Sequence, residues 1–145
     1  MGAPKQLPEI DEEQVRALAA PKSFERGYEY LQAGAVQRVV LRGNFLFAEV
    51  AGSEYDPYRV TVELSKKRIA EANCTCPYEF GGICKHIVAT LLAYIQTPEE
   101  IEHRQPIEEL IAPLSPEQLR ELILVLVQEQ PQLLDVIDDE LRPGS

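Results

Sequence analysis

The sequence has 145 residues, of which 45% are hydrophobic and 26% charged, a balance typical of a folded globular domain and not of a disordered tail. The 14 Lys and Arg residues are outnumbered by 24 Asp and Glu residues, and the net charge of -10 argues against a chain built to coat itself in nucleic acid or an anionic membrane. The longest apolar run, Leu122 to Val127, is far shorter than the ~20 residues that span a bilayer. The first residues, Met1–Gln6, contain no apolar secretory segment, so we expect a cytoplasmic protein.

Two helices are expected before residue 35. Apolar residues of the first recur at helical spacing, and the pattern stops at Pro21. The second has Ser23 as its expected N-cap and Gly34 where a helix end favours a left-handed residue. Its aromatic residues Phe24 and Tyr28 lie on one face, which predicts a role as core anchors.

From residue 35 the apolar period changes to two, which is typical of strands. Three or four antiparallel strands are expected, and the third, Tyr58–Leu64, alternates well enough to predict one buried and one solvated face. The last strand leads into the cysteines. The predicted strands cover residues 36–42, 45–51, 58–64 and 68–74.

The rest of the chain, from residue 86 on, is predicted to be helical apart from one polar link. A buried helix starts near His86 and stops near Pro98, and a polar link follows from Thr97 to Arg104. Ser115–Gln118 is a capping box, and the helix that begins there has apolar residues on most of its faces. Burial of that helix within the chain is expected, and a partner surface is the alternative. Pro131 opens a last short helix.

The expected fold class is therefore α+β, with N-terminal helices, a small antiparallel meander and an all-helical C-terminal segment. Residues 1–97 form the expected first domain and residues 98–145 an acidic extension. The first part holds 11 basic and 12 acidic residues, a net charge of -1, and the second holds 3 and 12, a net charge of -9. The acidity of the chain thus belongs mainly to its C-terminal helices.

All three cysteines and one of the two histidines lie in a single segment, Cys74 to His86. Three thiolates and an imidazole suit tetrahedral zinc. Cys74 and Cys76 point to the same side of a strand because side chains alternate, while Cys84 is expected just before the next helix and His86 in its first turn. All four donors come from the protein, so no position is open for water or substrate, and a structural zinc is predicted.

Other uses of these residues fit less well. One disulfide would leave the third cysteine unpaired. An iron–sulfur cluster usually needs four cysteines, and a Rieske centre takes one Cys and one His from each of two loops. A catalytic Cys84–His86 pair would lack a third residue to orient the histidine. Free or redox-active thiols remain the alternative. The sequence contains no phosphate-binding loop and no nucleophile elbow, and His103 lies in the polar link, so we do not expect an enzyme.

The pattern Cys-x-Cys, seven residues, Cys-x-His, with Pro77 after the second cysteine and Lys85 before the histidine, resembles the SWIM zinc finger. The resemblance spans roughly residues 14–95 and includes the approach segment from Ser23 to Tyr28. It implies that one zinc ion is bound by Cys74, Cys76, Cys84 and His86. Family members occur in bacterial Swi/Snf-type helicase-like ATPases, Mutator-type transposases and ubiquitin-pathway proteins, and the domain is regarded as a DNA-binding or protein-binding module.

Two hypotheses about the partner follow. In the first, cations bind the phosphates of DNA without sequence specificity. The alternative is that the basic hairpin turn is only a solvated surface. In the second, the finger or the acidic helices dock a protein, such as a helicase-like ATPase, without nucleic-acid contact. The candidate DNA contacts are Lys66, Lys67, Arg68 and Lys85, with Arg38, Arg42 and Arg59 as neighbours on the strands.

Overall fold

The computed structural model of the chain describes residues 8–78 and 81–143. It divides into two compact units, residues 1–106 and residues 107–145. The N-terminal segment Met1–Gln6, on which the prediction of a cytoplasmic protein rests, lies outside the described residues.

The first unit begins with two short helices, α1 (Glu12–Leu18) and α2 (Pro21–Gln32). Asp11 and Gln14 form a capping box at the start of α1. Pro21 is the first residue of α2, so the predicted N-cap at Ser23 is wrong: Ser23 lies inside the helix, is buried, and its hydroxyl donates to the Tyr78 hydroxyl at 3.1 Å. Proline sets the helix start because its fixed φ suits the first helical position.

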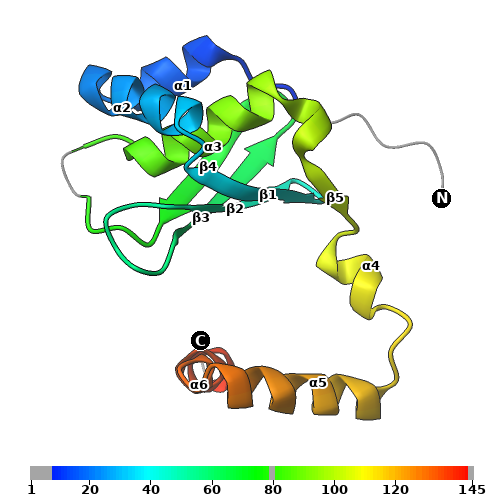
Figure 1. The fold of residues 1–145 in the computed structure, drawn as a ribbon. Coiled ribbons are helices and arrows are strands. Elements are labelled where there is room, and N and C mark those ends of the chain that lie inside the picture. Colours follow the sequence, from blue (N-terminus) through cyan, green and yellow to red (C-terminus); the bar gives the residue numbers. More distant parts are fainter. Residues whose placement is uncertain (1–7, 79–80, 144–145) are drawn as a thin grey trace. The chain divides into compact units, whose positions relative to one another are not determined.

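Four antiparallel neighbours form most of the sheet: β1 (Val36–Arg42), β2 (Phe45–Val50), β3 (Tyr58–Ser65) and β4 (Arg68–Cys74). These strands agree closely with the predicted ranges. A fifth strand, β5 (Glu102–Arg104), pairs in parallel with β1, so the order across the sheet is β4-β3-β2-β1-β5 (Figure 1). The sheet is therefore mixed and has one strand more than the predicted meander.

The predicted polar link over residues 97–104 is wrong in detail, because it contains a short 3-10 helix, η1 (Pro98–Glu100), and β5. Ile101 between them is buried. Glu102 accepts from Arg38 at 3.3 Å and from Arg104 at 2.5 Å, and these hydrogen bonds, that from Arg104 foremost, hold the pKa of its carboxyl below the ordinary value. The first compact unit accordingly reaches Pro106, beyond the expected boundary at residue 97.

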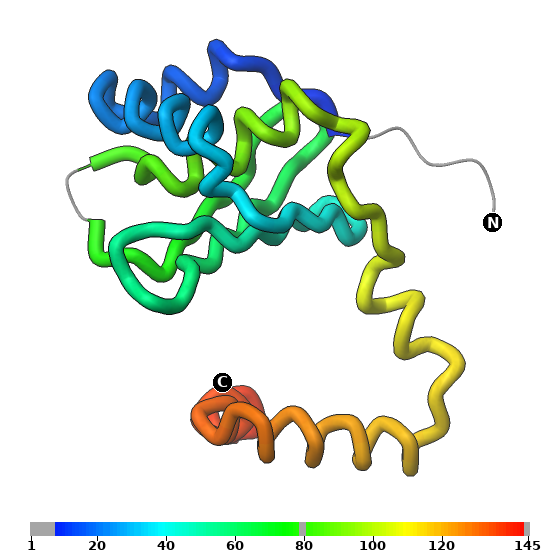
Figure 2. Tube along the Cα trace, in the orientation of Figure 1, coloured from blue at the N-terminus to red at the C-terminus, as the bar shows by residue number. Residues whose placement is uncertain are grey.

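One helix, α3 (Lys85–Gln96), crosses the inner face of the sheet, and α1 and α2 lie on the same side (Figures 1 and 2). The two helices α2 and α3 approach closely at Gly27, where a Cβ atom would lie 2.4 Å from Cγ1 of Val88. Between α3 and the sheet lies the apolar core. Its largest fully buried side chains are Leu46, Leu64, Leu91, Leu92, Val15, Val50, Val60, Val62 and Val88.

The second unit consists of α4 (Ile107–Ile111), α5 (Pro116–Glu129) and α6 (Leu133–Leu141). The capping box at Ser115 and Gln118 is confirmed. None of the residues in these three helices is buried within the second unit itself, and the burial of α5 within the chain stays a prediction. Among the described residues no helix has both the length and the apolar character needed to traverse a bilayer.

Candidate metal centre

The four predicted ligands come together where the sheet meets α3. Cys74 is the last residue of β4, Cys76 follows it, Cys84 is the N-cap of α3 and His86 lies in the first turn of that helix. The three sulfurs and a ring nitrogen of His86 all lie within 4.8 Å of one another. We call these four residues the Cys/His cluster.

The backbone around the cluster is held by hydrogen bonds to neighbouring elements. On the strand side, the Thr75 backbone N–H donates to the Arg59 carbonyl at 3.1 Å, and the Arg59 N–H donates to the Thr75 hydroxyl at 3.0 Å. On the helix side, the Ile83 N–H donates to the carbonyl of Leu18 at 3.0 Å. Gly82 has a φ of 73°, and a Cβ there would lie 2.5 Å from the same carbonyl, so only glycine fits this approach.

The orientation of the His86 ring tests whether zinc fits. Its Nδ1 atom lies 3.7 Å from Cys74 Sγ and 3.8 Å from Cys84 Sγ. Tetrahedral bonds of the usual Zn–S and Zn–N lengths place neighbouring donor atoms about 3.5–3.8 Å apart. Donor types and spacing both match one zinc ion, with Nδ1 as the imidazole ligand.

The other ring nitrogen of His86, Nε2, is buried and has no hydrogen-bond partner among the described residues. Two aromatic rings pack against the imidazole: the Tyr58 ring lies 4.4 Å away between ring centroids, and the Tyr30 ring packs edge-on at 5.5 Å. A metal-bound imidazole is commonly fixed by a hydrogen bond from its second nitrogen. Here ring packing sets the orientation instead.

Electrostatics within the cluster favour a thiolate at Cys84. A side-chain hydrogen bond between Cys74 and Cys84 lowers the pKa of Cys84 and raises that of Cys74, while burial raises the pKa of Cys76. Zinc binds thiolates, so its binding displaces the protons that the neutral thiols carry. The cluster is thus a proton-sensitive site whose affinity for zinc falls in acid.

Comparison with known proteins agrees with this geometry. Residues 58–95, which contain all four ligands, match the SWIM zinc finger family. This chain contains a SWIM zinc finger. The predicted zinc finger and its single zinc ion are confirmed by that match together with the Cys/His cluster.

Relatives of this SWIM zinc finger chain occur in distant organisms. The chain is 32% identical over 117 residues to the Zinc finger SWIM domain-containing protein 8 homolog of Drosophila melanogaster, covering 80% of this chain and 6% of that protein. It is 28% identical over 120 residues to Zinc finger SWIM domain-containing protein 8 of Homo sapiens, covering 80% and 6%. An uncharacterised protein of Methanocaldococcus jannaschii is 40% identical over 74 residues, 51% of this chain and 29% of that protein. No solved structure matches the chain.

The structure separates the predicted DNA contacts into two places. Lys66, Lys67 and Arg68 lie at the turn between β3 and β4, and all three are exposed. Lys85 lies beside the zinc ligands, with its ammonium group 5.0 Å from the centroid of the Tyr30 ring. Since Arg68 and Cys74 are the two ends of β4, the strand puts about 20 Å between these places.

Sequence reasoning missed the surroundings of His86. Tyr58 was expected on the buried face of its strand, and its alternation with Val60 and Val62 was the signal, but its contact with His86 was not foreseen. Gly52 was not singled out at all. A Cβ at Gly52 would lie 2.2 Å from Cε2 of Tyr58 and 3.4 Å from Nε2 of His86, so the absence of a side chain there makes room for the Tyr58 ring.

Proposed function

We propose that this SWIM zinc finger chain is a non-enzymatic, cytoplasmic binding module in which one structural zinc holds the junction of β4 and α3, and exposed cations bind DNA. The Cys/His cluster carries the proposal, because its four donors all come from the protein. A tetrahedral site that is closed in this way leaves no coordination position for a substrate. The function of the chain then lies in its surface.

The three cations of the β3–β4 turn project from a fixed backbone. The Glu9 N–H donates to the Lys66 carbonyl at 3.0 Å, and the Gln14 side chain donates to the Lys67 carbonyl. Both donors come from the segment that leads into and forms α1, so the turn is tied to a helix. A tied turn loses less conformational freedom when its side chains meet phosphates.

The distribution of charge agrees with a DNA-binding surface on the first unit. Residues 1–106 contain 12 basic and 15 acidic residues, a net charge of -3, whereas residues 107–145 contain 2 and 9, a net charge of -7. Most of the charge that would repel phosphate therefore belongs to the second unit. Local cations of the first unit can contact a duplex at low cost in repulsion.

A salt titration tests the proposal. If Lys66, Lys67, Arg68 and Lys85 each neutralise one phosphate, the affinity for a labelled duplex should fall with a log–log slope of about -3.6 in salt. Replacing Lys66, Lys67 and Arg68 by Gln should flatten that slope by about 2.7. The matched control replaces Lys22 and Arg26 of α2, which are equally exposed cations, and should leave the slope unchanged. Absence of duplex binding at low salt would contradict the proposal.

A second candidate function is that of an adaptor that docks a protein, such as a Swi/Snf-type helicase-like ATPase. The observation in its favour is an exposed apolar run on α5, Leu122 to Leu126, because exposed apolar patches mark interaction sites. The chain also spans only 6% to 29% of the relatives named above, so in those proteins the similar region is part of a longer chain. Calorimetric titration with a purified ATPase of this type, repeated with Leu124→Lys, tests the idea. If the substitution does not weaken binding, α5 is not part of the docking surface.

A further inference from the structure

The outer face of the sheet, turned away from α3, carries an aromatic pair. Phe45 and Phe47 are two residues apart on β2, the central strand, and both point outward, with exposed fractions of 41% and 39%. Their rings stack with centroids 6.2 Å apart and planes inclined by 25°. Exposed aromatic rings on a sheet have no role in the core of this unit, which lies on the opposite face.

Arginines from neighbouring strands flank the pair. By strand register, Arg42 lies opposite Phe45 on one side, and Thr61 lies opposite Phe47 on the other. Arg38 and Arg59 both lie opposite Glu49 on β1 and β3. Arg42 thus borders the aromatic pair directly on the β1 side. On the β3 side Glu63 lies opposite Phe45, and the nearest cation is Arg59, one outward-facing position beyond Thr61.

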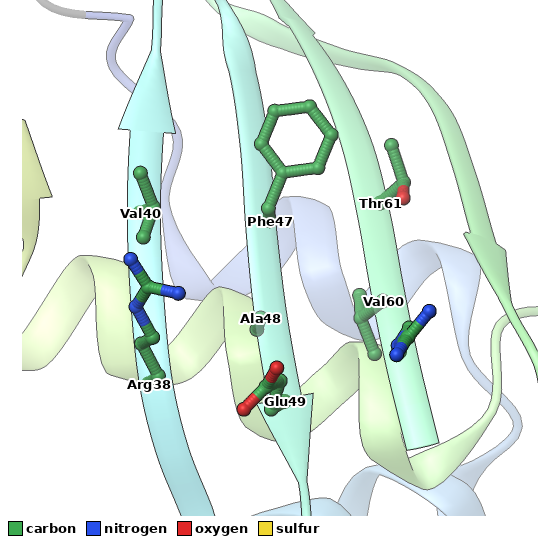
Figure 3. Close-up of a pocket in the computed structure, with 8 residues that line it drawn as sticks. Arg38, Val40, Phe47, Ala48, Glu49, Val60 and Thr61 are labelled. Atoms are coloured by element: carbon green, nitrogen blue, oxygen red, sulfur yellow. The ribbon is translucent and has the colours of Figure 1, made fainter. Parts of the chain in front are cut away.

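A shallow hollow of about 160 Å³ lies next to Phe47, lined by Arg38, Glu49, Arg59 and Thr61 among others. Figure 3 shows α3 behind the strands and the side chains of Arg38, Phe47, Glu49 and Thr61 on the near side. Pockets for drug-sized ligands measure about 300–1,000 Å³. This hollow therefore suits a single ring system of a longer ligand.

We propose that the outer face of the sheet is a stacking platform for single-stranded nucleic acid, with Phe45 and Phe47 under the bases and the flanking arginines on the phosphates. Base–aromatic stacking and a cationic border are the two elements of single-strand recognition on sheets. This inference rests on the proposed nucleic-acid function and names a second, different surface for it.

The acidic residues of this face bear on the choice of ligand. Glu102 is held by Arg38 and Arg104, whereas Glu49 makes no ion pair with a described residue. A free carboxylate repels phosphate but accepts hydrogen bonds from exocyclic amines of bases. The mixture of charges in the hollow therefore fits the edge of a splayed base better than a continuous phosphate backbone such as that of a duplex. By strand register, the acidic side chains of the face are Glu49, Glu63, Glu71 and Glu102.

A protein occupant fits less well. Two aromatic side chains exposed by about two fifths offer roughly 120–200 Å² of apolar area, and charged side chains surround them. A stable protein interface covers about 800 Å² on each partner, with charged residues depleted at its centre. Stacking needs only the faces of the rings.

The experiment measures binding of labelled single-stranded DNA and RNA to the full chain by fluorescence anisotropy. Phe47→Leu keeps an apolar side chain but removes the ring, and should weaken binding about tenfold, since stacking is worth one or more factors of ten per base. Phe47→Trp should keep wild-type affinity or exceed it. Neither change alters the number of charges, so the salt slope should stay the same.

The matched control is Tyr28→Leu, which removes a comparably exposed aromatic ring (45%) from α2 and should leave single-strand binding unchanged. Single-strand binding that is indifferent to Phe47→Leu and to Phe45→Leu would overturn the platform and leave the proposed function standing. Binding of duplex but of no single strand would do the same. If neither duplex nor single strand binds at low salt, both proposals fail.

Discussion

The two units of this chain use apolar residues in opposite ways. The first unit buries a row of aliphatic side chains between α3 and the sheet and adds the Cys/His cluster at the rim of that core. The second unit buries no residue in any of its three helices, and Leu124 on α5 is 63% exposed. Both units are rich in leucine and valine, so composition alone does not distinguish them.

Helix signals and core formation are therefore separate properties of a sequence. α5 has a full capping box and proline at its first turn, and such a cap is worth about 1 kcal/mol. Isolated helices of about 12–15 residues are nevertheless marginal in water, because most helix stability comes from packing. The first unit has that packing, whereas the second has mainly local stabilisation and the contact between α5 and α6.

Removal of zinc should produce the largest difference in stability between the two units. Structural zinc contributes about 10–16 kcal/mol in finger peptides, as much as the whole stability of about 5–15 kcal/mol of a typical domain. A chelator should therefore unfold residues 74–86 and the start of α3, while the strands persist in part on their apolar core and the second unit is unaffected. Circular dichroism melts and hydrogen exchange measure this.

Two histidine variants control the zinc experiment. His86→Ala should reproduce the effect of the chelator, whereas His103→Ala, in β5, should bind zinc like the wild type. Identical melts with and without chelator would show that the cluster does not stabilise the first unit.

The next largest contrast comes from one substitution made in both units. Leu91→Ala in α3 empties a fully buried position and should lower the free energy of unfolding by about 2–5 kcal/mol. Leu124→Ala in α5 should change it by less than about 0.5 kcal/mol, because its side chain is exposed. Urea denaturation followed by circular dichroism gives both values, and equal losses would mean that α5 is buried in solution.

A smaller effect is expected from Gly52→Ala, which acts on the zinc site through an aromatic ring. The added methyl group would displace Tyr58 from its place beside His86, and loss of such supporting contacts typically lowers metal affinity 10- to 100-fold. Competition with a zinc-binding dye measures the affinity. When Tyr58 is already replaced by Ala, adding Gly52→Ala should lower the zinc affinity no further. If the double variant instead loses the full additional affinity, the effect of Gly52→Ala comes from the backbone and not from the Tyr58 ring.

The smallest effect concerns Glu102, whose pKa is lowered by Arg104 and Arg38. A lowered carboxyl pKa stabilises the fold at a pH above the unfolded value, and this contribution disappears as the pH falls through the folded value. Glu102→Gln should therefore lower the melting temperature slightly at pH 7, and the difference from wild type should close in acid, once the pH has fallen through the lowered pKa of this carboxyl. Glu121→Gln in α5, where the carboxylate has no ion pair with a described residue, should show no difference at either pH.

The sequence predicted the elements whose pattern is local. Strict alternation located β3, and the spacing of cysteines and histidine predicted the place of the cluster between a strand and a helix. β5 escaped prediction because Glu102–Arg104 has no apolar residue of its own, and its pairing depends on β1 some sixty residues earlier.

The parts of the site that were missed depend on distances between segments. The pattern shows that Tyr58 faces inward, but not that His86 is its neighbour, because their contact requires the packing of α3 on the sheet. The covering of α5 also depends on contacts between segments. The apolar residues around most of this helix predict burial, and within its own unit α5 contacts α6 but has no buried residue.

The fifth strand has a consequence for the solubility of the fold. Without β5, β1 would be an edge strand with unpaired N–H and C=O groups beside the apolar run Val39–Leu41. Such an edge can pair with strands of other molecules. β5 closes it with three residues, Glu102, His103 and Arg104, and a short, charged strand is a poor template for further pairing. The polar segment after α3 thus protects β1 against intermolecular pairing. A fragment that ends before this segment should therefore tend to form intermolecular sheets.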